Sequence, residues 1–198
     1  MISRERVARV LAGELPDRVP LSDSYWTTTV DRWRQEGLPD DISPQAYFGT
    51  NEIARIGGDY TMQFPERVLE QNETMRLYWD SDGALRRDLH VAEGWTSQWL
   101  DFTIKTPDDW RAHRDRMAFR ASRISEHVVT AYRRAREADL FVCYSGHACF
   151  HPTWMRIGME QMLMLMLDQP DFIDMLFADH AQLIIDIYEE MVSRGMRF

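Results

Sequence analysis

Three side chains capable of metal binding or acid–base catalysis stand at alternate positions in one short segment. His147, Cys149 and His151 lie within residues 145–152, which follow a predicted buried strand over 138–144. Imidazole and thiolate groups are good zinc ligands, and imidazole is the most frequent general acid or base in enzymes. This loop is therefore the strongest candidate for a functional site, with His147 as a catalytic residue.

Aromatic residues flank the same loop. Tyr144 ends the predicted strand, and Trp154 lies at the start of the predicted helix that follows. We expect both, together with His151, to contact substrate. Two other interpretations stay open: His147 and Cys149 as weak candidates for metal ligands, or Cys149 as a small buried hydrophobe and His147 as a residue that hydrogen-bonds within the loop.

A second set of candidates follows another predicted strand. The short apolar run at 19–21 is expected to form the first strand, and Asp23, Tyr25 and Trp26 come soon after it. The functional interpretation is acid–base catalysis by Asp23 and substrate contact by the two rings. In the structural alternative, Asp23 caps the helix predicted over 27–35 and the rings pack.

Three further polar residues could take part in binding or catalysis. The stretch 59–65 is predicted to form the second strand, and it contains Gln63 as a candidate substrate-binding residue. Asp59, at its start, fits a catalytic role or a turn, and the turn is preferred. His180 falls on the apolar face of the helix predicted over 170–194, and we interpret it as a hydrogen-bonded core histidine.

The elements that must position these residues alternate between strands and helices. Residues 138–144 are the third predicted strand. Apolar spacing and capping residues predict helices over 4–12 with Ser3 as cap, 27–35, 44–48, 53–56, 106–117, 122–137, 153–167 and 170–194. Residues 66–104 differ, because short, partly alternating segments flank the turn signal Asp80-Ser81-Asp82-Gly83; they predict an antiparallel β insert.

Alternation of strands and helices favours an α/β fold with a parallel sheet. A complete (β/α)₈ barrel takes about 250 residues, and residues 196–198 look like the start of another strand. We therefore expect residues 1–198 to be the N-terminal part of a single barrel domain. The fold class is a partial (β/α)₈ TIM-like barrel with N-terminal helices and a β-hairpin insert at about 66–104.

Charge and composition exclude several classes of partner. The net charge is −9, from 23 basic and 32 acidic side chains, and such a surface repels nucleic-acid phosphates and anionic lipid. No apolar run approaches the roughly 20 residues that span a bilayer, and the N-terminus lacks the apolar segment of a signal peptide. We expect a cytoplasmic protein that acts on a small molecule, without nucleic-acid or membrane partners.

Several short motifs run through the whole chain in a fixed order: Ser3-Arg4-Glu5-Arg6-Val7, Pro16-Asp17-Arg18-Val19-Pro20, Arg32-Trp33, Glu36-Gly37-Leu38-Pro39, Trp79-Asp80-Ser81-Asp82-Gly83, Gly158-Met159-Glu160 and Leu167-Asp168-Gln169-Pro170. As an ensemble they resemble the uroporphyrinogen decarboxylase superfamily. The resemblance implies a (β/α)₈ barrel with its site at the carboxyl ends of the strands. It also implies a second half of the barrel, since full members are about twice this length.

That superfamily contains uroporphyrinogen decarboxylases of porphyrin biosynthesis and methyltransferases that use a corrinoid, often with zinc. Decarboxylases carry arginines after the first strand and an aspartate after the second. Here residues 22–27 contain no arginine, the first being Arg32, and no aspartate matches at 62–65. The chain is thus expected to resemble the methyltransferases more closely, with a tetrapyrrole decarboxylase as the alternative, because a tetrapyrrole with many carboxylates needs several arginines.

The resemblance implies a corrinoid and zinc as cofactors of the full-length enzyme and a corrinoid protein as a partner. The methyltransferase zinc motif lies in the second half of the barrel, so its role is not transferred to His147 and Cys149. A third alternative is a non-catalytic half-barrel that acts as a binding or assembly module. Its exposed sheet edges would need cover, which predicts a homodimer.

Overall fold

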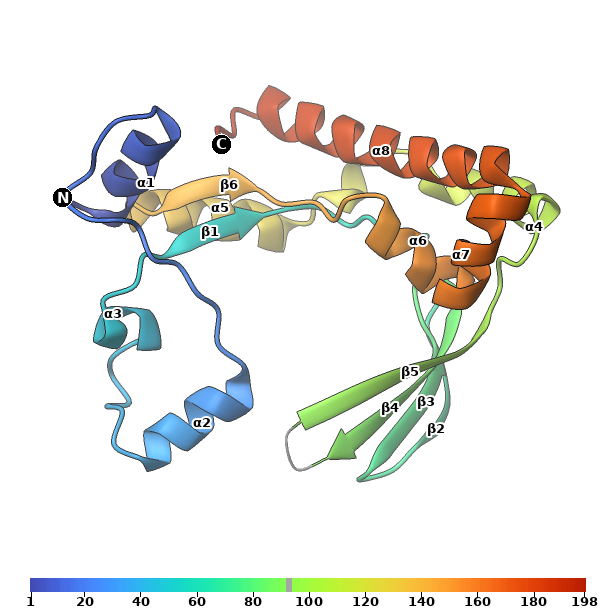
Figure 1. The fold of residues 1–198 in the computed structure, drawn as a ribbon, viewed down its shortest axis with the longest axis horizontal. Helices are drawn as coiled ribbons and strands as arrows, with labels where there is room; N and C mark the ends of the chain where they lie inside the picture. Colours follow the sequence, from blue (N-terminus) through green and yellow to red (C-terminus); the bar gives the residue numbers. More distant parts are fainter. Residues whose placement is uncertain (92–93) are drawn as a thin grey trace. The chain divides into compact units, whose positions relative to one another are not determined.

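A computed structural model describes residues 1–91 and 94–198 of the chain (Figure 1). The chain forms two compact units, each built from discontinuous segments. Unit 1 consists of Met1–Gly57, Ser125–Ser145 and Gly195–Phe198, and unit 2 consists of Gly58–Ile124 and Gly146–Arg194.

Unit 1 is organised on a pair of parallel strands. Strand β1 (Ile53–Ile56) pairs with β6 (Phe141–Tyr144), with Ile56 opposite Tyr144. Helix α5 (Glu126–Glu137) packs on both strands, and α1 (Ser3–Leu11) packs on β6. The strands are apolar and β-branched at the positions that face these helices, so that Ile56 and Val142 are buried.

Two short helices complete unit 1. Helix α2 (Thr27–Gln35) has the predicted bounds. Helix α3 (Pro44–Phe48) begins after Ser43, whose side chain accepts a hydrogen bond from the Ala46 N–H, and ends at Gly49 in the left-handed conformation. Both helices are therefore confirmed with the predicted start and stop signals.

Unit 2 contains an antiparallel sheet of four strands in the order β2-β3-β4-β5. They are β2 (Arg67–Gln71), β3 (Met75–Trp79), β4 (Ala84–Val91) and β5 (Gly94–Phe102). At the turn between β3 and β4, the Asp80 carboxylate accepts hydrogen bonds from the backbone N–H groups of Asp82 and Ala84. The antiparallel segment predicted over 66–104 is thus confirmed.

Helices form the rest of unit 2. They are α4 (Pro107–His113), two 3₁₀ turns (Arg114–Met117 and Ala121–Arg123), α6 (Phe150–Ile157), α7 (Met159–Asp168) and α8 (Pro170–Ser193). Helix α4 starts with a reciprocal capping box between Thr106 and Asp109. Its Trp110 is fully buried, as are Leu183 and Ile187 of α8, so the apolar stripe predicted for the last helix forms the core of this unit.

Two predicted strands are wrong. Residues 19–21 form no strand, and Val19 is 83% exposed, because Pro20 has no N–H to donate to a sheet. Residues 59–65 form a loop in which Gln63 has a positive φ of 53°. The first strand is instead 53–56, which was predicted as helical, and its parallel pairing with β6 explains the difference.

Three predicted helix boundaries also differ. Ser3 lies inside α1 rather than capping it, and its hydroxyl accepts a hydrogen bond from Asn51 Nδ2. Helix α5 begins at Glu126, after Ser125 as N-cap. The helix predicted over 153–167 is divided at Gly158, whose φ of 88° ends α6 and starts α7.

The mixed α/β class is confirmed. Within residues 1–91 and 94–198, the strands form one parallel pair and one antiparallel sheet, and neither closes into a barrel. Residues 196–198 form no strand; the Phe198 ring lies edge-on to Tyr132 and Tyr144. None of the helices in the described part of the chain combines the length and apolar character needed to cross a membrane.

Candidate active-site loops after the parallel strands

The carboxyl ends of β1 and β6 lie side by side within unit 1, where the Ser145 N–H donates to the Ile56 carbonyl at 2.8 Å. From there the chain enters unit 2 twice, at Gly58 and at Gly146. These two loops meet within unit 2, since a Cβ placed on Gly146 would stand 3.4 Å from the Tyr60 hydroxyl. Loops at this end of parallel strands form the ligand sites of α/β enzymes.

A buried arginine ties the loop after β1 to the helices. Arg156 of α6 is 1% exposed. Its Nε donates to Asp82 Oδ1 at 2.8 Å, and its Nη2 donates to the Tyr60 carbonyl at 2.6 Å. The third contact joins Nη1 to His180 Nδ1 at 3.1 Å. A fully buried guanidinium is stable only when such partners satisfy it, and here they come from three segments.

His180 of α8 extends this network to the loop after β6. Its Nε2 lies 3.0 Å from the His147 carbonyl. Because arginine can only donate, Nδ1 must accept from Arg156, and Nε2 therefore carries the proton and donates to His147. Burial, and next the charge of Arg156, lower the pKa of His180 to about 4. The prediction of a hydrogen-bonded core histidine is confirmed.

A second buried arginine holds the other side of the loop after β1. Arg123 Nη1 donates to the carbonyls of Asp59 and Thr61, both at 2.9 Å. The Asp59 carboxylate accepts from the Thr61 N–H and hydroxyl and from Gln63 Nε2. Burial alone would raise the pKa of Asp59, but the hydrogen bonds from Thr61 and Gln63 hold it below its ordinary value. Asp59 is an ionised turn residue in this geometry.

The side chains of the loop after β6 form an aromatic row. The exposed rings of His147 and His151 stack with centroids 5.2 Å apart, and His151 lies edge-on to Trp154 at 5.2 Å. Cys149 does not join this row. Its thiol donates a hydrogen bond to the Phe177 carbonyl of α8. His151 and Trp154, both predicted to contact substrate, are thus in contact with each other, and His151 also contacts His147, the predicted catalytic residue.

A metal centre does not form from these residues alone. Across residues 1–91 and 94–198, no group of three or more His, Cys, Asp or Glu side chains is arranged to hold a metal ion. The weak metal candidates, His147 and Cys149, therefore do not fit a zinc site by themselves, since structural and catalytic zinc need at least three protein ligands.

The candidates of unit 1 differ in exposure and in contacts. Asp23 is exposed and accepts from the Ser24 N–H instead of capping α2, whose N-cap is Trp26. Tyr25 packs edge-on to Trp33 at 5.0 Å, while Trp26 is 80% exposed. Tyr144 is half-buried beside Phe198. Trp26 is the one of these aromatic candidates that is open to a ligand without rearrangement.

Gln63, a candidate substrate-binding residue, also stabilises the loop after β1. Its Nε2 donates to Asp59 at 2.8 Å, and its Oε1 accepts from Arg120 at 3.4 Å. The sequence interpretation missed Arg123, Arg156 and Asp82. One signal was available for Arg156: it shares an apolar helix face with Thr153 and Ile157, and a lone arginine on such a face is paired when buried.

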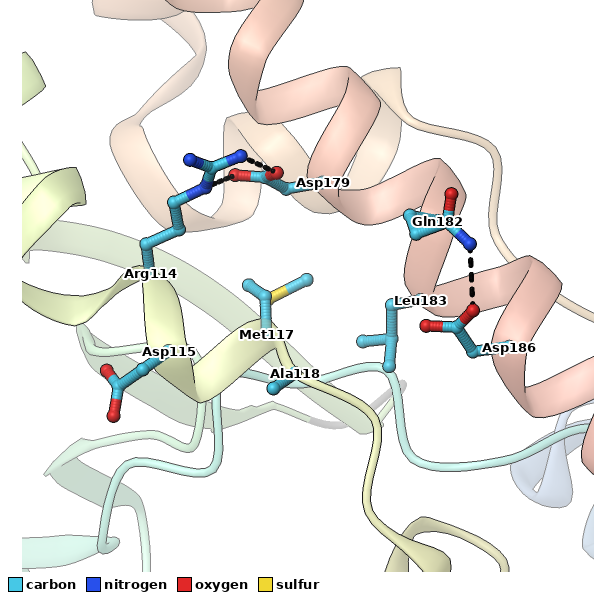
Figure 2. A pocket seen from close by; sticks show the side chains of 8 residues that line it. All are labelled: Arg114, Asp115, Met117, Ala118, Asp179, Gln182, Leu183 and Asp186. Carbon is cyan, nitrogen blue, oxygen red and sulfur yellow. Dashed lines mark hydrogen bonds and ion pairs between the residues drawn. The ribbon is translucent and has the colours of Figure 1, made fainter.

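A separate hollow of about 340 Å³ lies between the Arg114–Met117 turn and α8 (Figure 2). Arg114 Nε and Nη2 each donate to Asp179 at 2.7 Å, and Trp110 Nε1 also donates to Asp179. Gln182 donates to Asp186 at 2.8 Å. The side chains of Arg114, Asp179, Gln182 and Asp186 are therefore already paired, while Asp115 also lines the hollow.

Comparison with known proteins gives no relative for this chain. No protein-family model matches it, and neither the curated proteins nor the solved structures provide a significant match. The geometry of the two loops and the resemblance of the sequence motifs are therefore the basis for a functional assignment.

Proposed function

We propose that this chain is the N-terminal part of a (β/α)₈-barrel enzyme of the uroporphyrinogen decarboxylase superfamily that transfers a methyl group between a small molecule and a corrinoid. The observation that carries the proposal is the pair of loops after β1 and β6, which the buried Arg156–His180 contact joins. It supports a ligand site at the carboxyl ends of parallel strands.

Within this proposal each residue has a defined task. His147 and His151 are exposed imidazoles that take up or return a proton at the atom that loses or gains the methyl group. Trp154, which lies edge-on to His151, supplies aromatic surface for the substrate. Arg156 and His180 are positioning residues, since they touch the loop backbone and fix where His147 stands.

The described residues do not arrange three zinc ligands among themselves, and the tasks given above do not depend on zinc. Decarboxylation of a tetrapyrrole is the second candidate function. The arrangement of arginines supports it less well than methyl transfer. The substrate's carboxylates need several arginines, and the first arginine after residues 22–27, Arg32, is already paired with Glu36 at 2.9 Å.

The test is binding of a methylcobamide to the full gene product, followed by its absorbance spectrum, with uroporphyrinogen titrated separately. We expect methylcobamide to bind and His147→Ala to lower methyl-transfer turnover about a hundredfold, the usual scale for loss of a general acid or base. His127→Ala, which removes an exposed histidine of α5, is the matched control and should leave turnover unchanged.

Absence of methylcobamide binding would refute methyl transfer. Turnover of uroporphyrinogen would favour the decarboxylase instead. A stable dimer that binds neither compound would favour the non-catalytic module.

A further inference from the structure

A hollow within unit 2 lies between β5 and the junction of α6 and α7. Its volume is about 550 Å³, within the range of small-molecule sites. Three aromatic rings line it, from Trp99, Phe102 and Trp154, together with Ile157 and Met159. Such a lining binds flat apolar groups.

Two of the rings form a corner. Trp99 and Trp154 meet edge-to-face with centroids 4.9 Å apart and planes inclined by 71°, and both side chains are half-buried. The Arg86 guanidinium lies 4.9 Å from the centroid of Trp99. The Trp99 ring thus already takes part in a cation–π contact inside this unit.

Gly158 creates the space at the junction of the helices. A Cβ at this position would lie 2.7 Å from the Phe102 ring, and its φ is 88°. Glycine is therefore required twice, for the left-handed turn that separates α6 from α7 and for the close approach of Phe102. The hollow depends on a specific break in the helix rather than on loose packing.

The lining of the hollow carries a single charge, and that charge is negative. Glu160 is the only ionisable residue that lines the hollow, and none of the basic side chains in residues 1–91 and 94–198 lies within ion-pair distance of it. Gln161 uses its Nε2 to donate to the Lys105 carbonyl at 2.6 Å, which leaves its Oε1 as an acceptor. A cationic nitrogen complements both groups.

The N-terminus of α7 has the opposite preference, since a helix start attracts anions. Glu160 lies in the first turn of that helix and already neutralises it. The Glu160 carboxylate and the chain's net charge of −9 both favour a cationic ligand over an anionic one.

We infer that this hollow is a binding site for a small aromatic amine, whose ring lies in the Trp99–Trp154 corner and whose ammonium group pairs with Glu160. The inference rests on the lining of this hollow and does not require methyl transfer. Trp154 is common to this site and to the aromatic row of the candidate loop.

The probes are tryptamine and indole-3-acetate, which share a ring and differ in charge, titrated into the full gene product by calorimetry. A ligand of this size in an aromatic site should bind with a Kd of about 0.1–1 mM. We expect tryptamine to bind at least about tenfold more tightly than indole-3-acetate.

Two substitutions locate the site. Glu160→Gln changes an exposed side chain and should remove the preference for tryptamine, whereas Glu137→Gln, an exposed residue of α5, should retain it. Trp154→Ala should weaken tryptamine about tenfold; a thermal melt shows whether this variant is folded.

Equal affinity for the two probes, preference for indole-3-acetate, or a tryptamine preference that survives Glu160→Gln would each overturn the inference. Because methylcobamide binding is measured separately, failure here is distinguishable from failure of the proposed function.

Discussion

The loop after β1 is held by two buried arginines whose surroundings differ. Arg123 donates only to backbone carbonyls, those of Asp59, Thr61, Arg116 and Ala118, in the described part of the chain. Arg156 donates to one carbonyl, to the Asp82 carboxylate and to His180. Both arginines are 1% exposed. They therefore show two ways of stabilising a buried guanidinium: by backbone carbonyls alone, or by a carboxylate and a histidine together with one carbonyl.

The difference concerns what each arginine connects. Arg123 closes a local structure, because its four acceptors lie within residues 59–61 and 116–118. Arg156 joins the hairpin turn at Asp82, the loop at Tyr60 and helix α8 through His180. Breaking the Arg156 contacts should therefore affect the position of His147, whereas breaking the Arg123 contacts should affect the loop after β1 and the segment 116–118.

The largest expected effect is on Arg156. Arg156→Met leaves the Asp82 carboxylate, which is 14% exposed, without its cation. Removing one partner of a buried ion pair costs about 3–5 kcal/mol of unfolding free energy, measurable by urea denaturation. Adding Asp82→Asn should restore part of this loss, since the amide oxygen still accepts from the Met62 N–H and carries no charge.

Arg123→Met, alone and combined with Asp82→Asn, is the control for the Arg156–Asp82 double-mutant experiment. Asp82→Asn should change the loss for Arg123→Met only slightly, because in the described part of the chain Arg123 interacts with Asp82 through charge and not through a hydrogen bond. Equal rescue of both arginine variants by Asp82→Asn would show that the two sites are not distinct.

The next effect depends on pH. The pKa of His180 is lowered to about 4 in the folded chain, against about 6.5 when unfolded. Between these values the unfolded chain binds more protons, so acidification favours unfolding. The stabilisation is complete above pH 6.5 and is lost as pH falls to 4, a change of roughly 3 kcal/mol.

His180→Gln is the variant that isolates this contribution. Its amide can donate to the His147 carbonyl and accept from Arg156 without titrating. The difference in unfolding free energy between the original protein and this variant should change between pH 6.5 and 4. A difference that is constant over this range would exclude His180 as the source.

These networks mark the limit of what the sequence could predict. Local signals were sufficient for α2, α3, the capping box at Thr106 and the hairpin at Asp80–Gly83, since each depends on neighbouring residues. Strand β1 was missed because its pairing with β6 joins residues about 90 positions apart. Short apolar segments do not distinguish strand from helix without that partner.

The candidate site shows the same limit. The stacked pair His147 and His151 follows from spacing along one loop. Arg156, Asp82 and His180 come from three distant segments, and their contact depends on tertiary packing. The predicted position of Asp23 failed for a related reason, since the strand expected before it is absent.

The smallest effect concerns the Arg114–Asp179 pair in Figure 2. It sharpens the comparison because its arginine is exposed, whereas its carboxylate, at 14%, is as little exposed as that of Asp82. Arg114 is 56% exposed, and Asp179 keeps the hydrogen bond from Trp110 when Arg114 is replaced. Arg114→Gln should therefore cost at most about 1 kcal/mol, and 1 M salt should reduce the loss further. Arg111→Gln, in a more exposed pair with Asp108, should have almost no effect. A loss for Arg114→Gln as large as that for Arg156→Met would mean that burial does not set the difference between these ion pairs.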